Sequence, residues 1–232
     1  MQKKSKKNGI LLFVKYPKTG YVKSRLSTHI DKKFVVTLYK SFVEDTIDNL
    51  KDLDCDILVC FYPPEKREYF KNWIGSSYQY LPQDGEDLGE RMKNCFLKGF
   101  DLGFEKLLVI GSDSPDLPKT IVKDAFYNLD KNDCVIGPCK DGGYYLLGFT
   151  NQKFSQNIFS DIPWSTKEVL EKTKHLLKNN FLKIYELPIW QDVDTIDDLK
   201  DLYLRNKIKG IKKSKTQTVL DEYFKKNRQE IK

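Results

Sequence analysis

The alternation of short apolar runs with longer segments of helical period constrains the fold of this chain more than any other feature. Runs of strand length occur at 10–16, 55–62, 77–83, 106–111 and 134–138, and segments with apolar residues at helical spacing occur at 34–50, 65–74, 87–103 and 119–129. Strands and helices that alternate in this order imply parallel strands covered by helices on both faces. The sequence therefore predicts the α/β class, as a three-layer α-β-α sandwich.

The alternation changes after Pro138. The sequence CKDGG places a turn before the apolar run 144–149, which favours a strand that is antiparallel to the others or crosses them. We therefore expect a mostly parallel, partly mixed sheet. A helix from about Ser165, a strand over 182–188 and a helix over 194–207 complete the predicted domain, and 218–227 can form one more helix.

The basic charge of the chain is concentrated at its two ends. The 232 residues carry a net charge of +7, whereas residues 200–232 alone carry +7 and residues 1–7 carry +4, so the segment between them is acidic. We predict a basic tail over 1–9, a single domain over 10–207 and a basic extension over 208–232. These ends can make a weak contact with an anionic surface. We expect no nucleic-acid partner, because aromatic and basic residues do not interleave.

The apolar runs and the cysteines of the sequence indicate where the protein is located and whether its thiols are oxidised. The sequence has no run of eighteen apolar residues and no apolar stretch behind its basic start, so we expect neither a transmembrane segment nor a signal peptide, and a cytoplasmic location. The number of cysteines, five, is odd, and their spacing is not typical of a zinc site. We expect most of them to be reduced thiols in the core.

The segment VIGSDSPDLP ends a buried strand in an acidic turn. Gly111 allows a ligand to approach the backbone closely, and the two prolines fix the exit of the chain. Asp113 is thus a candidate ligand for Mg²⁺ or Mn²⁺ and a candidate catalytic residue, with Ser112 as a nucleotide contact. The structural alternative is that Asp116 or Ser114 caps the following helix.

A cationic loop follows the first strand, in the sequence VKYPKTGYVKSRLS. A loop of this kind, with a glycine and several cations, is suited to phosphate oxygens. It contains neither GxxxxGK[ST] nor GxGxxG, so the sequence supports neither an ATPase P-loop nor a dinucleotide site. An ordinary surface loop is the alternative. The candidate nucleotide-binding residues are Lys15, Pro17, Gly20, Lys23 and Arg25, and Lys23 is also a candidate catalytic residue.

Two more acidic segments follow strand ends. In GPCKDGGYYLLG, Asp141 is a candidate catalytic carboxylate on the acceptor side, although a plain hairpin also explains the glycines. In WQDVDTIDDL, Thr195 and Asp198 are expected to cap a helix, which leaves Asp192 and Asp194 as candidate metal ligands opposite Asp113.

The loop PLPQDGEDLGERM adds candidates for contact with a base or ribose. These are Gln83, Gly85 and Arg91, while Asp87 is expected to cap the helix that follows. The carboxyl ends of parallel strands lie at one edge of a sheet, so we expect the cationic loop and the acidic segments to meet at one cleft. The sequence has only two histidines, which disfavours nucleophilic catalysis based on histidine. Phosphoryl or glycosyl transfer with a metal and cations fits better.

These motifs together resemble a bacterial and archaeal family called selenodomain-associated transferase 1, which is glycosyltransferase-A-like. The resemblance spans about residues 10–200 and rests on KYPKTGYVKSRL, QDGEDLGERM, IGSDSPDLP, GPCKDGGYYLLGF, IPWSTKEVL and DVDTIDDL, in that order. It implies a nucleotide-diphospho-sugar transferase fold. The segment VKSRL and the acidic turn are also similar to those of 2-phospholactate guanylyltransferase, and DVDTIDDL resembles the D.DTPEDL ending of many nucleotidyltransferases.

The sequence departs from the related enzymes at two points. It lacks the GxGxRMxxxxPK loop of the common nucleotidyltransferases, and its acidic turn reads Asp-Ser-Pro-Asp instead of the Asp-x-Asp of many glycosyltransferases. Our main hypothesis is a Mg²⁺- or Mn²⁺-dependent glycosyltransferase that takes a nucleotide or nucleotide-sugar donor and a small-molecule acceptor. The alternatives are a nucleotidyltransferase that releases pyrophosphate and a nucleotide-binding module without catalysis.

Overall fold

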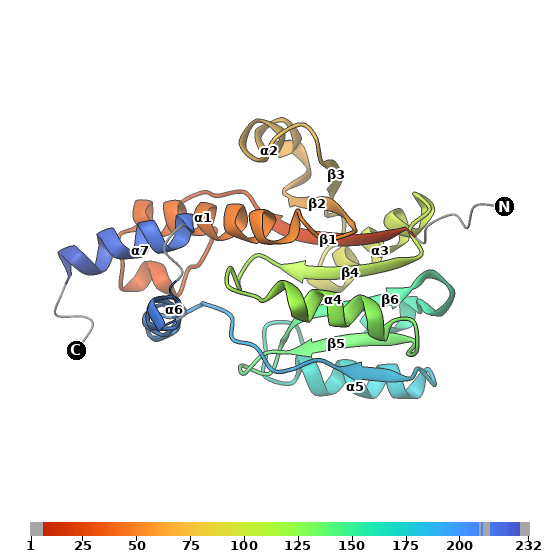
Figure 1. The fold of residues 1–232 in the computed structure, drawn as a ribbon. Helices are drawn as coiled ribbons and strands as arrows, with labels where there is room; N and C mark the ends of the chain where they lie inside the picture. The colour runs from red at the N-terminus through yellow and green to blue at the C-terminus, as the bar shows by residue number, and fades with distance from the viewer. Residues whose placement is uncertain (1–6, 209, 211–213, 228–232) are drawn as a thin grey trace.

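A computed structural model describes residues 7–208, 210 and 214–227, and within them a seven-stranded sheet forms the centre of the fold (Figure 1). The strand order is β3-β2-β1-β4-β6-β5-β7. β6 runs antiparallel to its neighbours β4 and β5, and the other pairs are parallel, so the predicted mixed sheet is confirmed. The strands are β1 (Asn8–Lys15), β2 (Asp56–Tyr62), β3 (Gln79–Pro82), β4 (Lys106–Gly111), β5 (Cys134–Pro138), β6 (Tyr144–Thr150) and β7 (Ile184–Glu186).

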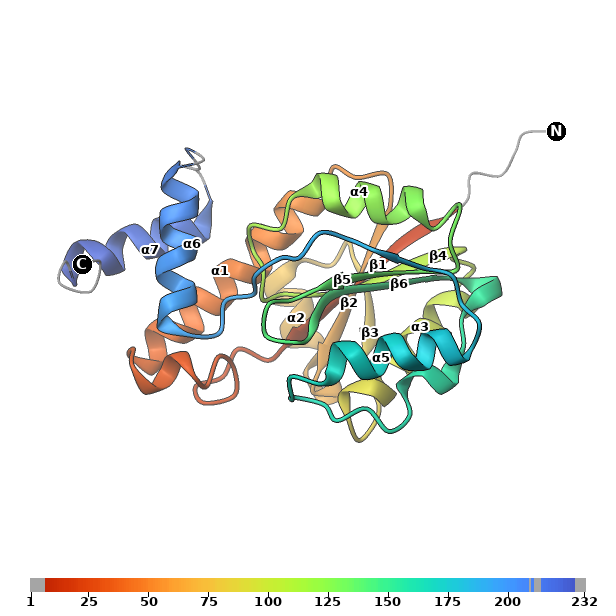
Figure 2. The same ribbon diagram turned by 90° about the horizontal axis from the view of Figure 1, so that it is seen from below.

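Helices cover both faces of this sheet, as the three-layer prediction requires (Figure 2). Alternate residues of β1 point to opposite faces: Ile10 and Leu12 lie in the core beneath α1 and α4, whereas Leu11 packs in the core beneath α3 and α5. The helices are α1 (Lys32–Leu50), α2 (Arg67–Ile74), α3 (Leu88–Asp101), α4 (Lys119–Asn128), α5 (Val169–Asn179), α6 (Ile196–Ile208) and α7 (Lys215–Lys226). Short 3₁₀ turns lie at Leu26–Thr28, Pro64–Lys66, Asn151–Lys153 and Gln156–Phe159.

Two expectations about helix starts are wrong. The helix expected from about Ser165 begins at Val169, because Ser165 has a φ of +67°, which a helix cannot accommodate. Neither Asp116 nor Ser114 caps α4, whose N-cap is Pro118 without a side-chain hydrogen bond. Asp116 instead accepts a hydrogen bond from Arg205 Nε at 3.2 Å, which ties the acidic turn to α6.

Two helices, α6 and α7, pack on the part of α1 that projects away from the sheet. Figure 1 shows α6 and α7 beside the first half of α1, away from the sheet. Leu220 and Phe224 of α7 are buried against α1 and α6, and the Asp45 carboxylate of α1 accepts hydrogen bonds from the first two backbone amides of α7. The helical part of the segment predicted as a basic extension, residues 215–226, therefore packs on the fold.

Parts of the predicted basic ends lie outside the described residues, namely 1–6, 209, 211–213 and 228–232. The predicted contact with an anionic surface thus falls largely outside what the structure describes. Within the described residues, no helix combines the length and apolar character that crossing a bilayer requires. All five cysteines are free thiols.

Candidate functional site

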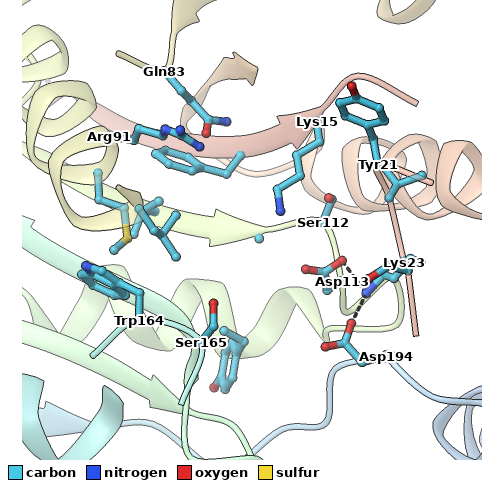
Figure 3. A pocket seen from close by; sticks show the side chains of 18 of the residues that line it. Lys15, Tyr21, Lys23, Gln83, Arg91, Ser112, Asp113, Trp164, Ser165 and Asp194 are labelled. Carbon is cyan, nitrogen blue, oxygen red and sulfur yellow. Dashed lines mark hydrogen bonds and ion pairs between the residues drawn. The ribbon is translucent and has the colours of Figure 1, made fainter. Parts of the chain in front are cut away.

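A cavity of about 660 Å³ opens at the carboxyl ends of β1 and β4 (Figure 3). Its position is where open α/β sheets bind ligands, and its volume suits a nucleotide-sized molecule. Charged side chains line the part next to the acidic turn, and the part next to α3 has apolar side chains together with Glu86, Asp87 and the predicted contact Arg91. The charged lining includes Lys15, Lys23, Arg25, Asp113 and Asp194.

Lys23 joins the two acidic segments of this cavity. Its Nζ lies 2.5 Å from Asp113 Oδ1 and 2.8 Å from Asp194 Oδ1, and Figure 3 shows the ammonium between the two carboxylates. The Lys23 side chain is 3% exposed, although its neighbours are 48% and 36% exposed. Burial alone lowers the pKa of Lys23, but the two carboxylates outweigh burial and raise the pKa above its ordinary value. The ammonium is therefore charged at any physiological pH.

Backbone hydrogen bonds explain why residues eighty positions apart meet here. After β7 the chain runs along the carboxyl ends of β5 and β4, where Trp190 N donates to Pro138 O and Val193 N donates to Asp113 O, both at 3.0 Å. The acidic turn and the loop that carries Asp192 and Asp194 are thus hydrogen-bonded to each other. The expected meeting of the acidic turn, the cationic loop and Asp194 at one cavity is what the structure contains.

A helix cap fixes the end of that loop. Thr195 N donates to Asp198 Oδ2 at 2.8 Å, Asp198 N donates to Thr195 Oγ1 at 3.3 Å, and Asp194 N donates to the same carboxylate at 3.1 Å. This reciprocal pair is the predicted capping box of α6. Asp194 directly precedes Thr195, so the start of α6 determines the position of Asp194 in the cavity.

A second group of acidic side chains lies near Asp113 and Asp194. Single ligand atoms of Cys139, Asp141 and Asp192 fall within 4.8 Å of one another. Burial, and then the Asp141 and Asp194 carboxylates, raise the pKa of Asp192 to about 6. Burial and these carboxylates also raise the pKa of the Cys139 thiol, so it stays neutral. Cys139 was not among the predicted site residues, although its place directly after a strand end is a usable signal.

The donor chemistry of the site fits Mg²⁺ or Mn²⁺. Both are hard cations that prefer carboxylate oxygens, and Asp113, Asp192 and Asp194 supply them at one edge of the sheet. A neutral thiol is a poor ligand for such ions, so Cys139 adds nothing to the set. Asp141 is exposed and accepts a hydrogen bond from Gly143 N at 2.9 Å. Neither Asp141 nor Asp192 belongs to the residues that line the cavity, and these two carboxylates neighbour each other.

The loop that carries Asp141 is fixed by a close approach of two segments. Gly142 has a φ of +91°, and a Cβ at this position would overlap the carbonyl of Lys167. Its own carbonyl accepts a hydrogen bond from Leu170 N at 2.8 Å. Only glycine satisfies both demands, so the glycines serve this packing as well as the turn.

Of the five residues predicted in the cationic loop, three line the cavity and two determine the course of the loop. Lys15, Lys23 and Arg25 line the cavity, with Arg25 Nη1 3.9 Å from Asp194 Oδ2. Pro17 is buried and Gly20, with a φ of +80°, occupies a turn; neither lines the cavity. These two residues therefore determine the course of the loop and do not face a ligand.

The remaining predicted nucleotide contacts have structural partners of their own. Gln83 lines the cavity, but its Nε2 donates to Val14 O at 3.3 Å and to Cys60 O at 2.6 Å, so its amide hydrogens are already used. Ser112 lines the cavity and donates to Tyr39 Oη at 3.3 Å. Gly85 is not a lining residue; its carbonyl accepts from Arg91 Nε at 3.0 Å.

Several lining residues were not predicted, because they lie inside a predicted element or, like Trp164, directly before one. Tyr39 is buried in α1, accepts a hydrogen bond from Lys15 N at 2.7 Å, and has a pKa raised by burial to about 12. Trp164 packs its ring on Gly89 at the start of α3, where a Cβ would collide with the indole. The apolar and aromatic side chains of the lining are Phe13, Tyr21, Val22, Tyr39, Leu88, Met92, Val109, Tyr144, Tyr145 and Trp164. Helical or strand spacing alone marks such residues as core.

Known proteins share this fold. The profile of a family described as "Uncharacterized protein conserved in bacteria (DUF2064)" matches residues 46–166. A structure from Desulfovibrio desulfuricans G20, provisionally named a nucleotide-diphospho-sugar transferase, has 39% identity and a TM-score of 0.92, and covers 96% of this chain and 97% of that chain.

Two more distant structures show the fold alone. The 4-diphosphocytidyl-2C-methyl-D-erythritol synthase of Anaerococcus prevotii DSM 20548 has 13% identity and a TM-score of 0.56, with 86% of this chain and 96% of that chain covered. Rv0371c of Mycobacterium tuberculosis H37Rv, in complex with manganese, has 14% identity and a TM-score of 0.51, with coverages of 85% and 98%.

Proposed function

We propose that this chain, which belongs to the DUF2064 family, is a divalent-metal-dependent transferase that uses a nucleotide-diphospho-sugar donor. The observation that carries the proposal is the meeting of Asp113, Asp194 and three cations at one cavity of nucleotide size. The provisional name of the Desulfovibrio protein supports this class of reaction, and the manganese in the structure of Rv0371c supports a divalent metal. The finer resemblance to selenodomain-associated transferase 1 agrees with it.

In this proposal Asp113, Asp192 and Asp194 hold Mg²⁺ or Mn²⁺. The bound ion supplies positive charge that stabilises a leaving nucleoside diphosphate. Lys15, Lys23 and Arg25 bind the phosphate oxygens through charge-assisted hydrogen bonds. Gln83 and Ser112 keep the wall of the nucleotide site in place through their own hydrogen bonds.

The acceptor side of the reaction is assigned to Asp141. In glycosyl transfer the bond from the anomeric carbon to the diphosphate breaks, an acceptor oxygen bonds to that carbon, and the acceptor proton passes to a carboxylate. Asp141 is an exposed carboxylate next to Asp192, which suits this role. The Trp164 ring, which belongs to the lining of the cavity, offers an apolar surface for the sugar.

Nucleotidyl transfer with release of pyrophosphate is the second candidate. The three cations at the charged end of the cavity favour it, because a nucleoside triphosphate carries more negative charge than a diphospho-sugar. The synthase from Anaerococcus prevotii, whose name contains a cytidyl group, supports this alternative.

Ligand screening with product analysis tests the proposal and separates the two reactions. We expect thermal stabilisation of the full chain by Mn²⁺ together with UDP-glucose, GDP-mannose or a related sugar nucleotide. With an acceptor, ³¹P NMR should then detect a nucleoside diphosphate. Stabilisation by a nucleoside triphosphate and by no sugar nucleotide, with pyrophosphate as product, would reject glycosyl transfer.

An Asp113→Asn substitution tests the metal site itself. It removes a charged contact of about 1–3 kcal/mol, so we expect metal-dependent nucleotide affinity to fall roughly 5- to 150-fold in calorimetric titrations. Asp101→Asn, at the exposed end of α3, is the matched control and should change nothing. Unchanged affinity in Asp113→Asn would favour a nucleotide-binding module without catalysis.

A further inference from the structure

The ammonium of Lys23 occupies the gap between the two carboxylates of the cavity. Both oxygen atoms, Asp113 Oδ1 and Asp194 Oδ1, lie within 2.8 Å of Nζ. Lys23 reaches this position with a φ of +47°, which residues other than glycine rarely adopt. The surrounding structure therefore holds Lys23 in an unusual backbone conformation while its side chain points inward.

A divalent metal cannot share this gap with the ammonium. Mg²⁺ requires carboxylate oxygens at about 2.0–2.1 Å, so an ion bound by both of these oxygens would lie against the Lys23 Nζ. Two cations at such a separation repel strongly inside a protein. Asp113 and Asp194 can therefore bind a metal together only after Lys23 has left them.

The ammonium of Lys23 is within reach of a ligand in the cavity. Lys23 belongs to the lining, and a lysine has a flexible four-carbon stem that can redirect its head. Lys15 and Arg25 line the same end, where the phosphates of a donor are expected. A diphosphate bound there would offer Lys23 negative charge to replace the carboxylates, whereas the metal alone would not.

We propose that Lys23 is a positioning residue that couples the binding of metal and diphosphate. In the free protein it is the counter-ion of Asp113 and Asp194, and a metal ion alone binds weakly. A diphosphate that accepts the ammonium frees the carboxylates and raises the affinity for the metal. Linkage requires the metal to raise the affinity for the diphosphate by the same factor. This inference rests on the proposed function.

The affinity for Mn²⁺ alone tests the coupling. Electron paramagnetic resonance measures free Mn²⁺ in titrations of the wild type and of Lys23→Met, which keeps the length of the stem but removes the charge. We expect the variant to bind Mn²⁺ at least about tenfold more tightly, because one positive charge beside the ion is gone. We also expect it to melt at a lower temperature than the wild type without metal and to recover with Mn²⁺.

Lys18→Met is the matched control. Lys18 is an exposed cation of the same loop, with its Nζ 4.7 Å from the centre of the Tyr21 ring, and the substitution changes the net charge equally. It should bind Mn²⁺ as the wild type does. Equal Mn²⁺ affinity in the wild type and Lys23→Met would overturn the role of Lys23 alone. Failure of all three proteins to bind Mn²⁺, even with UDP present, would overturn the metal site and the proposed function as well.

A measurement on the wild type covers the case in which Lys23→Met does not fold. Side-chain ¹⁵N spectra detect lysine ammonium groups that are buried and ion-paired. Lys23 and Lys106 both qualify, since Lys106 is 7% exposed and lies 2.7 Å from Asp130. Mg²⁺ with UDP should shift the signal of Lys23, because the partners of its ammonium change from carboxylates to phosphates, and should leave that of Lys106 in place. An unshifted Lys23 signal in the saturated protein would overturn the proposal.

Discussion

At the scale of single residues, Asp192 is a carboxylate of the acidic site whose surroundings disfavour its charged form. Its pKa of about 6 lies above the ordinary 3.8 of an aspartate, because burial and the Asp141 and Asp194 carboxylates disfavour its charge. A folded protein that holds this proton up to pH 6 loses stability as the pH rises from 3.8 to 6, and the full cost persists at higher pH. Above pH 6 the Asp192 carboxylate is charged, and this charge lowers the free energy of unfolding of the protein.

Asp192→Asn should stabilise the protein in the absence of metal. We expect its free energy of unfolding at pH 7.5 to exceed that of the wild type by about 1–3 kcal/mol, because two pKa units correspond to at most roughly that range. The difference should vanish below pH 3.8, where the wild-type carboxyl is protonated in both states. Urea unfolding of the two proteins across pH 3.5–7.5 measures this, and a difference independent of pH would contradict the assignment.

The sequence allowed the charged residues of the cavity to be predicted, but not their pairing. Asp113, Lys23 and Asp194 each follow a strand end, and strand ends share one edge of the sheet. The inward direction of Lys23 depends on its positive φ, which no local pattern in VKSRL signals. Tyr39 and Trp164 could not be predicted as lining residues, because inside helices and loops they are indistinguishable from core.

At the scale of secondary structure, the capping box of α6 connects helix stability with the site. Partial burial pushes the pKa of Asp198 upward, but the hydrogen bonds from Thr195 and Gln191 outweigh it and hold the pKa below its ordinary value. A lowered folded pKa contributes stability above pH 3.8, and this stability is lost as the pH falls through the folded value.

Asp198→Ala should therefore cost about 1 kcal/mol of unfolding free energy at pH 7, with the difference shrinking as the pH falls below 3.8. Asp197→Ala is the control, because its side chain is 86% exposed in the same turn. Thermal melts of both variants at pH 7 and pH 3 measure the effect. Equal losses in the two variants would show that the cap adds no stability beyond helix propensity.

Most elements could be predicted from hydrophobic period, while their ends depended on single residues. β4 and β5 begin and end where the apolar runs do, since Gly111 and Pro138 end them. The start of α5 was missed because the backbone of Ser165 is left-handed. The antiparallel β6 was predictable, because the turn at Asp141 returns the chain directly beside β5.

At the scale of the whole molecule, α7 makes the carboxyl-terminal segment part of the packed structure. Phe224 is 1% exposed, its ring centre lies 4.6 Å from that of Tyr203, and it belongs to the core shared with α1. The basic composition of this segment concealed its apolar face, which only the spacing of 220 and 224 indicates.

Phe224→Ala tests whether α7 unfolds together with the α/β core. The substitution removes a buried ring, so we expect a loss of about 3–5 kcal/mol and a single transition at a lower temperature. Phe181→Ala, at a position 94% exposed, should leave the melting temperature unchanged. A first transition confined to α7, followed by a second at the wild-type temperature, would show that 208–232 is a separate extension.

The hydrogen bond from Val193 to Asp113 has a consequence during synthesis on the ribosome. The first four strands can emerge and pair before the loop after β7 exists, yet the acidic turn then lacks Asp192 and Asp194. A nascent chain that stops short of residue 192 has these strands but neither of the two carboxylates. Premature release would thus yield a product without the complete ligand site, and ligand affinity would distinguish complete molecules from it.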